Sequence, residues 1–310
     1  MAVKDGDIKF NTDSVISPHY KQLESSLYEW AQKCDFISNL ELFKSRKYAS
    51  CAARLFPFVK NFETLSLTSK LLTWMFYWYD YIDSCKSEKI NIICCELIEA
   101  LKRKEYVQAK ENSSVQQAMF VSLIDLWMQA IKLTPPSWQQ RFINSLKVQL
   151  TEDKEIDCEY IGFCFHENSD LKFSREMRFG INYCLILMEF AYNVFLSEEA
   201  LNTEVMNLVV ANFSSSIVGI HDLFHYQKEK RDGGLNNYIS IYINKYSYSE
   251  KESFAEVIKM VNDGIYRHAM IMENIGSHTN DENIRKFVKL LSFYFRGLFD
   301  FYNESTRYVY

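Results

Sequence analysis

The sequence predicts an all-α protein, and three features support this prediction. Glycine and proline, which form many of the turns in β-rich folds, number only 9 and 4 among 310 residues. Apolar side chains recur mostly with the period of a helix. Runs of alternating polar and apolar residues, which would indicate strands, are not found. We therefore expect one helical domain over residues 17–310, preceded by a loose polar arm at residues 1–16.

The first half of the chain contains three helical landmarks. A helical pattern opens at Ser17 and runs to about Lys33. Residues 66–82 are apolar nearly all round, which predicts a central buried helix. Pro135 and Pro136 mark a helix boundary, because proline is tolerated in the first turn but not in a helix interior.

The second half continues the same pattern with longer segments. Residues 180–195 predict a second deeply buried helix, and residues 202–231 predict a third long one. The glycines at 233–234 follow this segment as a helix stop. Residues 249–276 and 281–307 predict two more helices. The chain is thus expected to contain about ten or more helices.

Composition narrows the range of partners and compartments. Hydrophobic residues at 48% and charged residues at 24% exclude a disordered or collagen-like chain. A net charge of −5 provides no basic footprint for nucleic acid. Uncharged apolar runs stay shorter than a membrane span, so we expect no stable membrane insertion. The N-terminus shows no targeting signal, which predicts a cytoplasmic protein.

The eight cysteines favour the same compartment. They fall mostly within apolar helical patterns, and their spacing matches no metal or disulfide framework. We expect buried free thiols in a reducing cytosol.

Two carboxylates stand out at the end of the first buried helix. Asp80 and Asp83 are three residues apart, so they share one helical face. Carboxylates at a helix C-terminus oppose the helix dipole, and in an apolar setting they require a cation. A solvated helix end is the simpler alternative.

A second group of candidate ligands lies on the third long segment. His221, His225 and Glu229 are spaced four and four, which places them along one stripe of a helix. Two imidazoles and a carboxylate in this arrangement can bind a divalent ion, and Lys228 beside them can meet an anion. The alternative is a pair of surface histidines on a charged helix.

Several cations also require a partner. Arg175 and Arg178 precede Gly180, at the mouth of an apolar segment. Arg307 and Tyr308 lie at the extreme C-terminus, where a solvated tail is the ordinary interpretation.

The order and spacing of these features resemble a microbial-type class I terpene synthase, the family that ionises isoprenyl diphosphates with three magnesium ions. The resemblance extends over nearly the whole chain, with Arg175 placed 46 residues before His221 and Phe301 standing where the family has Trp. The matching segments, in chain order, are Ser17-Pro18-His19-Tyr20 with Trp30, Ala52–Pro57, Trp74–Asp83, Arg175, His221–Glu229, Gly233 with Asn237, and Gly297–Tyr308.

The resemblance implies a fold and an activity. The fold is a single-domain class I terpenoid synthase bundle of α-helices around an apolar, aromatic-lined cavity. The activity is that of a carbon–oxygen lyase acting on phosphates, with farnesyl diphosphate as the expected substrate and a terpene hydrocarbon or alcohol as product. The expected cofactor is a cluster of three Mg²⁺ ions, with Mn²⁺ as the alternative. The expected partner is the small-molecule prenyl diphosphate, and the protein is a monomer or a homodimer.

The resemblance also assigns roles to residues. The metal ligands are Asp80, Asp83, His221, His225 and Glu229. The substrate-binding residues are Arg175, Lys228, Arg307, Tyr308, Phe76 and Met75, and the catalytic residues are Arg175, Asp80 and Tyr308. Further candidates for the cavity lining are Phe213 and Ile217.

Three positions depart from the family pattern. Tyr79 stands at the first aspartate of the acidic motif, and His221 and His225 replace an Asn and a Ser. Magnesium prefers oxygen ligands, whereas imidazole suits Mn, Fe, Co or Zn. We therefore expect activity to fall as pH drops through about 6.5, and Mn²⁺ to support it better than Mg²⁺.

Three other functions remain as alternatives. The departures fit a degenerate family member that binds a prenyl diphosphate without turnover. A zinc hydrolase built on the two histidines and Glu229 is a second, although the sequence lacks the Glu of a His-Glu-x-x-His motif. A helical interaction scaffold is the third.

Overall fold

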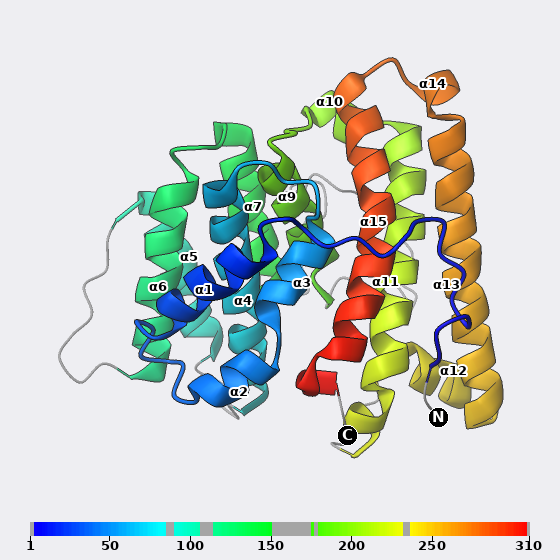
Figure 1. Ribbon diagram of the computed structural model, residues 1–310, viewed down its shortest axis with the longest axis horizontal. Helices are drawn as coiled ribbons and strands as arrows, with labels where there is room; N and C mark the ends of the chain where they lie inside the picture. Colours follow the sequence, from blue (N-terminus) through cyan, green and yellow to red (C-terminus); the bar gives the residue numbers. More distant parts are fainter. Residues whose placement is uncertain are drawn as a thin grey trace. The chain divides into compact units, whose positions relative to one another are not determined.

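The computed structural model is helical throughout the part of the chain that it describes, apart from loops and the N-terminal segment (Figure 1). Within that part, the only strand-like pairing is an isolated bridge between Asp5 and Ile8. The all-α prediction is therefore confirmed. The described residues are 3–84, 90–105, 114–150, 175–176, 179–231 and 236–308.

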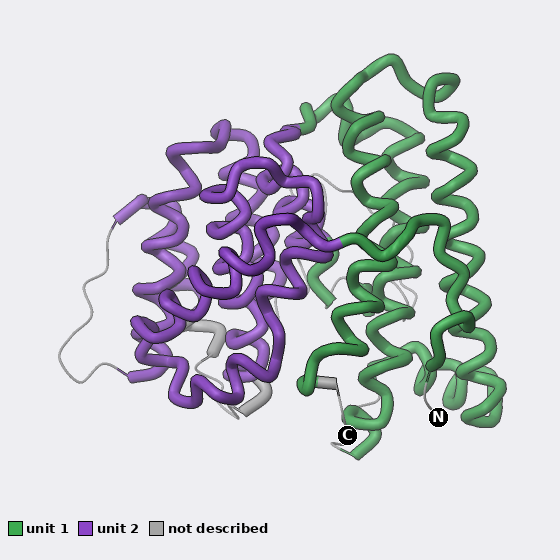
Figure 2. The backbone as a smooth tube through the Cα atoms, viewed as in Figure 1, with its two compact units in different colours: residues 1–15, 162–181, 196–310 green, residues 16–161, 182–195 purple. Residues whose placement is uncertain are grey.

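The chain divides into two compact units, shown in Figure 2. Unit 1 comprises residues 1–15, 162–181 and 196–310, and unit 2 comprises residues 16–161 and 182–195. The helices of unit 2 are α1 (Tyr20–Ala31), α2 (Leu40–Ser45), α3 (Tyr48–Leu55), α4 (Phe62–Ser84), α5 (Ile90–Arg103), α6 (Val115–Ala130), α7 (Pro136–Leu150) and α9 (Ile181–Tyr192), whose first residue belongs to unit 1.

Buried tryptophans join the helices of unit 2. Trp74 of α4 donates its indole N–H to the carbonyl of Met119 in α6 at 2.8 Å. Trp127 of α6 donates in the same way to α5, and Trp138 of α7 donates to α9, each at 3.0 Å. A buried indole N–H requires an acceptor, and these bonds supply it while fixing how neighbouring helices pack. The indoles therefore help to hold α4, which carries the acidic motif.

Helix α4 matches the buried helix that the apolar run predicts. Leu71, Trp74 and Trp78 are fully buried, and the two indole rings stack with their centroids 5.2 Å apart. Thr68 and Thr73 donate their hydroxyls to backbone carbonyls one turn earlier in the helix, Thr73 at 2.7 Å. The helix can consequently bury these two hydroxyl groups within an apolar surface.

Unit 1 contains the long C-terminal helices. They are α10 (Glu198–Leu201), α11 (Glu204–Arg231), α12 (Tyr238–Tyr246), α13 (Glu250–Glu273), α14 (Ile275–His278), α15 (Glu282–Glu304) and the short 3₁₀ turn η2 (Thr306–Tyr308). Local sequence sets where they begin. Ser249 and Glu252 form a capping box at the start of α13, and Asp281 caps α15 by accepting from two backbone N–H groups.

Two glycines allow α11 and α13 to approach closely. A methyl group at Gly264 of α13 would collide with Ser216 of α11, and one at Gly219 of α11 would collide with Val261 of α13. Because glycine has no side chain, the two helix backbones can pack closely at both positions. This contact packs the middle of α11 against α13, and α11 carries the candidate metal ligands.

The N-terminal segment follows an extended path over unit 1, seen in dark blue in Figure 1. The backbone N–H of Lys9 donates to Asn262 of α13 at 2.7 Å, and Asn262 donates to the carbonyl of Asp7 at 3.0 Å. The Phe10 ring lies 5.2 Å from that of Phe299 in α15. Composition alone predicts only a polar, non-helical segment and gives no indication of these anchoring contacts.

The predicted helices agree with the structure to within a few residues at their ends. The largest difference is at α4, which begins at Phe62 rather than Ser66. The first helix begins at Tyr20 rather than Ser17, because the Ser17 carbonyl accepts from the Tyr20 N–H as part of a preceding turn. The predicted stop at 233–234 lies outside the described residues. Every described cysteine is a free thiol, and Cys34, Cys51 and Cys94 are buried as expected, whereas Cys184 is half-buried and Cys95 is exposed.

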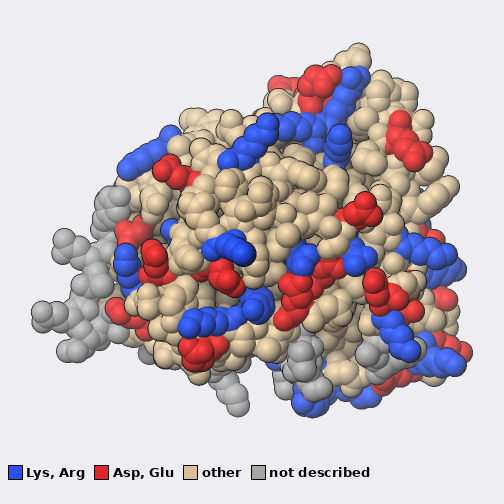
Figure 3. Space-filling view, in the orientation of Figure 1, with Lys and Arg blue, Asp and Glu red and all other residues tan. Residues whose placement is uncertain are grey.

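Two further observations concern the described helices and the surface. No described helix has the length and apolarity needed to cross a membrane. On the face shown in Figure 3, the described acidic and basic side chains are intermingled rather than gathered into one basic field.

Candidate active site

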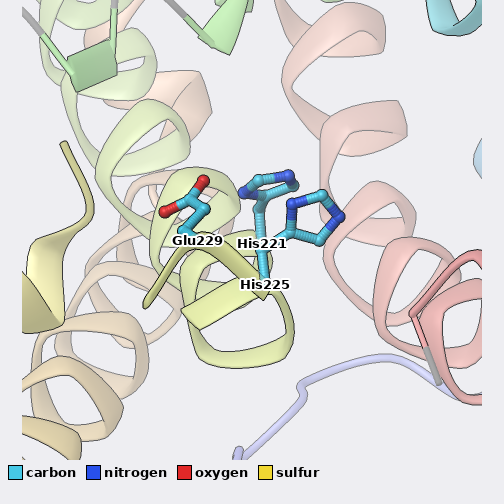
Figure 4. A group of neighbouring side chains, drawn as sticks. All are labelled: His221, His225 and Glu229. Carbon is cyan, nitrogen blue, oxygen red and sulfur yellow. The ribbon is translucent and has the colours of Figure 1, made fainter. Parts of the chain in front are cut away.

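The C-terminal half of α11 gathers three metal-competent side chains. His221, His225 and Glu229 each offer a ligand atom, and these atoms lie within 4.8 Å of one another. The two imidazole rings are 4.1 Å apart between centroids, with the carboxylate beside them (Figure 4). Since side chains four apart are neighbours on a helix, one element suffices to assemble the cluster.

A buried ion pair lies next to this cluster. The guanidinium of Arg175 donates from Nε to both carboxylate oxygens of Asp222, at 3.2 and 3.1 Å, and its Nη2 also donates to Oδ1. Asp222 is fully buried and accepts a further bond from the backbone N–H of Tyr238 at 2.7 Å. Burial raises the pKa of Asp222, but Arg175 and His221 outweigh this effect and hold that pKa below its ordinary value.

Asp222 is a site residue to which sequence reasoning gave no role. It lies inside the His221-Asp-x-x-His225 segment, but its position beside a ligand does not reveal that it faces Arg175. The sequence feature that points to this contact is the 46-residue spacing from Arg175 to His221, the neighbour of Asp222. The amide of Asn237, which donates to the Asp222 carbonyl at 3.2 Å, also caps α12 through its side-chain oxygen.

His221 contacts both members of the ion pair. Its Nδ1 lies 3.1 Å from Asp222 Oδ1 and 3.1 Å from Arg175 Nη2. The ring of Phe179 packs edge-on against it, 5.0 Å between centroids. These contacts fix the plane of the imidazole.

Burial keeps both histidines neutral. It lowers the pKa of His221, with the positive charge of Arg175 acting in the same direction. It lowers the pKa of His225 further, assisted by His221 and Arg307. Any loss of activity caused by protonation of these histidines should therefore occur below about pH 6.5, where an unperturbed imidazole titrates, because desolvation disfavours the charged form.

Glu229 lies in an unusual environment for a carboxylate. Its side chain is 24% exposed, and its Oε1 is 3.8 Å from Arg175 Nη2. Burial raises the pKa of Glu229 to about 7, and the charge of Asp222 adds to the shift. Its Oε2 is shielded from solvent and accepts no hydrogen bond within the described part of the chain.

The structure describes some of the predicted anion-binding side chains and not others. Lys228 is half-buried on α11, next to Glu229. Arg307 is half-buried and close enough to lower the pKa values of both histidines. Tyr308 ends the turn η2, but its side chain lies outside the described residues, as does all of Arg178.

The end of α4 is bonded within unit 2. Asp80 forms an ion pair with Arg46 at 2.8 Å, so a guanidinium supplies the cation that this carboxylate needs at a helix C-terminus. Tyr79 donates its hydroxyl to Gln149 of α7, and Tyr81 donates to Gln116 of α6 at 3.3 Å. Asp83 belongs to α4, but its side chain lies outside the described residues. Arg46 and Gln149 carried no sequence signal.

The candidate cavity residues are buried in their own units, except for Phe76, which is half-buried. Met75 is buried in α4, and the half-buried Phe76 stacks on Tyr48 with centroids 5.3 Å apart. Phe213 of α11 is fully buried and packs against the ring of Tyr294 at 5.3 Å. Ile217, one turn further along, is also fully buried.

The α11 cluster meets the chemical requirements of a divalent cation. It combines two neutral imidazoles with a carboxylate, and one shielded carboxylate oxygen receives no donor from the described residues. Leaving such an atom without a partner is unfavourable, and a bound cation would remove that penalty. His221, His225 and Glu229 would hold the ion.

The chain is similar to known proteins of one family. Residues 70–267 match the family model described as terpene synthase family 2, C-terminal metal binding. A germacrene A synthase from Nostoc punctiforme is 22% identical over 304 residues, which cover 92% of this chain and 89% of that protein. A terpene cyclase, braA, from Annulohypoxylon truncatum is 22% identical over 270 residues, covering 81% of this chain and 69% of the cyclase.

Solved structures share the fold at lower identity. A linalool/nerolidol synthase from Streptomyces clavuligerus, in complex with 2-fluorogeranyl diphosphate, superposes with a TM-score of 0.74 at 16% identity, covering 97% of this chain and 99% of that one. An α-eudesmol synthase superposes with a TM-score of 0.74 at 15% identity, covering 95% and 97%.

Proposed function

Since the chain belongs to the terpene synthase family, we propose that it ionises a prenyl diphosphate, with farnesyl diphosphate as the leading candidate. The observation that carries this proposal is the cluster of His221, His225 and Glu229 with Arg175 beside it. It combines donors for a divalent ion with a fixed cation, and a diphosphate leaving group requires both.

The proposed reaction breaks the allylic carbon–oxygen bond. Both electrons of that bond leave with the diphosphate, and the resulting carbocation later loses a proton or takes up water. A bound divalent metal would neutralise the leaving group as its charge develops. Arg175, Lys228 and Arg307 would donate hydrogen bonds to the diphosphate oxygens, and we assign Tyr308 to the same task by resemblance.

The remaining assignments follow from the family resemblance. We propose Asp80 and Asp83 as the acidic contribution of α4, with Asp80 acting only after it exchanges Arg46 for another cation. We propose Met75 and Phe76 as contacts for the prenyl chain, where aromatic faces stabilise cations. Residues 17–310 would act as one functional domain, as a monomer or homodimer, in a reducing cytoplasm.

One set of contacts favours a second candidate function, a protein that binds a prenyl diphosphate without turnover. Tyr79 stands where the family has its first acidic ligand, and it is bonded to Gln149. Asp80 is bonded to Arg46. If these contacts persist when ligand binds, α4 contributes little to metal binding.

Product analysis separates the two functions. The full chain is incubated with geranyl, farnesyl or geranylgeranyl diphosphate and with Mg²⁺ or Mn²⁺, and volatile products are identified by gas chromatography. We expect terpene products, reduced at least about 100-fold by Glu229→Gln. His278→Asn, which changes an exposed histidine on α14, is the matched control and should leave product formation unchanged.

A binding measurement completes the test. Calorimetry with a farnesyl diphosphate analogue that cannot ionise detects binding without turnover. Binding without products supports the second function and contradicts the first. Neither products nor binding would contradict both.

A further inference from the structure

The donors on α11 do not match the ion that the family uses. Magnesium takes oxygen ligands in near-octahedral geometry and rarely accepts imidazole. Two of the three donor groups here are imidazoles, and their ligand atoms lie within 4.8 Å of each other and of the Glu229 carboxylate. We propose that α11 by itself forms a site for one divalent transition-metal ion, which binds Co²⁺ or Zn²⁺ in preference to Mg²⁺.

The spacing of the donors supports a single shared ion. Two ligands of one such ion, each about 2.1 Å from it, are separated by at most roughly 4.2 Å. The three donor atoms already lie within 4.8 Å of one another. Small side-chain rotations are therefore sufficient to bring them onto one ion, and no backbone movement of α11 is needed.

The neighbour of His221 supports coordination through its ring. Coordination at Nε2 requires the tautomer with hydrogen on Nδ1, and Asp222 Oδ1, 3.1 Å from Nδ1, can accept that hydrogen. Arg175 Nη2 is also 3.1 Å from Nδ1, but it already donates to Asp222 Oδ1, so it does not require Nδ1 as an acceptor. Asp222 is itself fixed by Arg175 and by the Tyr238 N–H. A carboxylate that orients a ligating histidine is the usual second partner of transition-metal sites.

The cations near the site disfavour an ion held by charge alone. Arg175 Nη2 is 3.8 Å from Glu229 Oε1, and Arg307 is near both histidines. Asp222 balances the charge of Arg175. The single donor carboxylate of Glu229 is then offset by the nearby cations Lys228 and Arg307, so electrostatic attraction for Mg²⁺ is weak. Imidazole nitrogen bonds to Co²⁺ and Zn²⁺ do not depend on net charge in the same way, so the preference should be large.

Three protein donors also leave coordination positions open, as in catalytic rather than structural metal sites. A diphosphate oxygen would occupy such a position during turnover. This last step rests on the proposed function, whereas metal binding itself does not and is measured without substrate.

The test is a titration of the full chain after removal of metals by a chelator. Mg²⁺, Mn²⁺, Co²⁺ and Zn²⁺ are added separately and followed by calorimetry, with Co²⁺ also followed by its visible absorption. We expect Co²⁺ and Zn²⁺ to bind on the order of 100-fold more tightly than Mg²⁺, with Mn²⁺ between them. The visible Co²⁺ bands should show nitrogen coordination.

Variants locate the site. His225→Ala should weaken Co²⁺ binding at least about tenfold, and the combined change His221→Asn with His225→Ser should remove the preference over Mg²⁺. His278→Asn, on α14, is the control and should leave Co²⁺ affinity unchanged. Asp80→Asn removes a carboxylate proposed for α4, so it tests whether α11 is sufficient, and Co²⁺ should still bind. Circular dichroism confirms folding, and His225→Gln replaces His225→Ala if the alanine variant does not fold.

Equal affinity for Mg²⁺ and Co²⁺ would overturn the proposal, as would Co²⁺ binding that survives His225→Ala in a folded protein. Loss of Co²⁺ binding in Asp80→Asn would show that α11 is not sufficient. Failure of the proposed function is distinguishable, because it appears as Co²⁺ binding without terpene products.

Discussion

The last turns of α4 and α11 pose the same electrostatic problem and resolve it differently. Each places carboxylates near the C-terminus of a buried helix, where the dipole is unfavourable to negative charge. On α4, Asp80 is neutralised by Arg46, and both side chains are partly exposed, at 28% and 20%. On α11, Arg175 donates its hydrogen bonds to the buried Asp222. Glu229 Oε2 is shielded from solvent and receives no hydrogen bond from the described residues.

This difference indicates which end is ready for a ligand. The polar groups of α4 at Tyr79, Asp80 and Tyr81 already have protein partners. In the α11 cluster, burial raises the pKa of Glu229 and lowers the pKa values of His221 and His225, and Glu229 Oε2 accepts no hydrogen bond from the described residues. Ligand binding at α11 therefore requires less rearrangement than at α4.

The largest expected effect is on the free energy of unfolding, when the arginine of each ion pair is replaced by methionine. Arg175→Met leaves Asp222 charged and fully buried, and losing one partner of a buried pair costs about 3–5 kcal/mol. Arg46→Met leaves Asp80 partly solvated, which costs less than about 1 kcal/mol. Urea unfolding followed by circular dichroism measures both. Equal losses would contradict the distinction between the two helix ends.

Acid provides the next largest effect through a buried histidine that belongs to neither helix end. Burial lowers the pKa of His268 to about 4, against 6.5 as its ordinary value, although its bond to the Val288 carbonyl opposes the shift. The unfolded chain thus binds a proton first as pH falls. Stability should drop between pH 6.5 and 4, by on the order of 3 kcal/mol, and the loss from this group should stop below pH 4.

The control for the acid effect is His268→Gln, which keeps a donor for Val288 but does not titrate. Unfolding free energies measured from pH 7 to pH 4 should depend less on pH in this variant. An unchanged slope would mean that another group causes the acid instability. The variant also gives a background in which acid effects on the α11 histidines can be measured separately.

The sequence predicted the helices more fully than the site because the two depend on different information. Local periodicity and caps place α4, α11, α13 and α15, since each buries a face along its own length. His221, His225 and Glu229 were also predictable, because one helix sets their spacing. Bonds between Arg46 and Asp80, or Tyr79 and Gln149, join residues 34 and 70 positions apart and depend on tertiary packing.

Asp222 lies between these two cases. Its position in the chain is that of a site residue, but its role depends on Arg175 and on the N–H of Tyr238, which arrives from the next helix. A sequence motif identifies the type of residue and does not say whether its side chain faces the ligand or supports a neighbour. Burial and partners decide this, and both are properties of the folded chain.

The smallest expected effect concerns Tyr79, and it tests whether the α4 end can be returned to the family pattern. Tyr79→Phe removes only the hydroxyl that bonds Gln149 and should cost about 1 kcal/mol, with no change in metal preference. Tyr79→Asp removes the same bond but adds a carboxylate one residue from Asp80. If α4 limits metal binding because it lacks this carboxylate, Tyr79→Asp should raise Mg²⁺-dependent product formation relative to Tyr79→Phe. Gas chromatography at several Mg²⁺ concentrations measures this. Identical Mg²⁺ dependence in the two variants would mean that the tyrosine at position 79 is not the cause of the difference between α4 and α11. The ion pair of Asp80 with Arg46 would then be what keeps the acidic motif from binding metal.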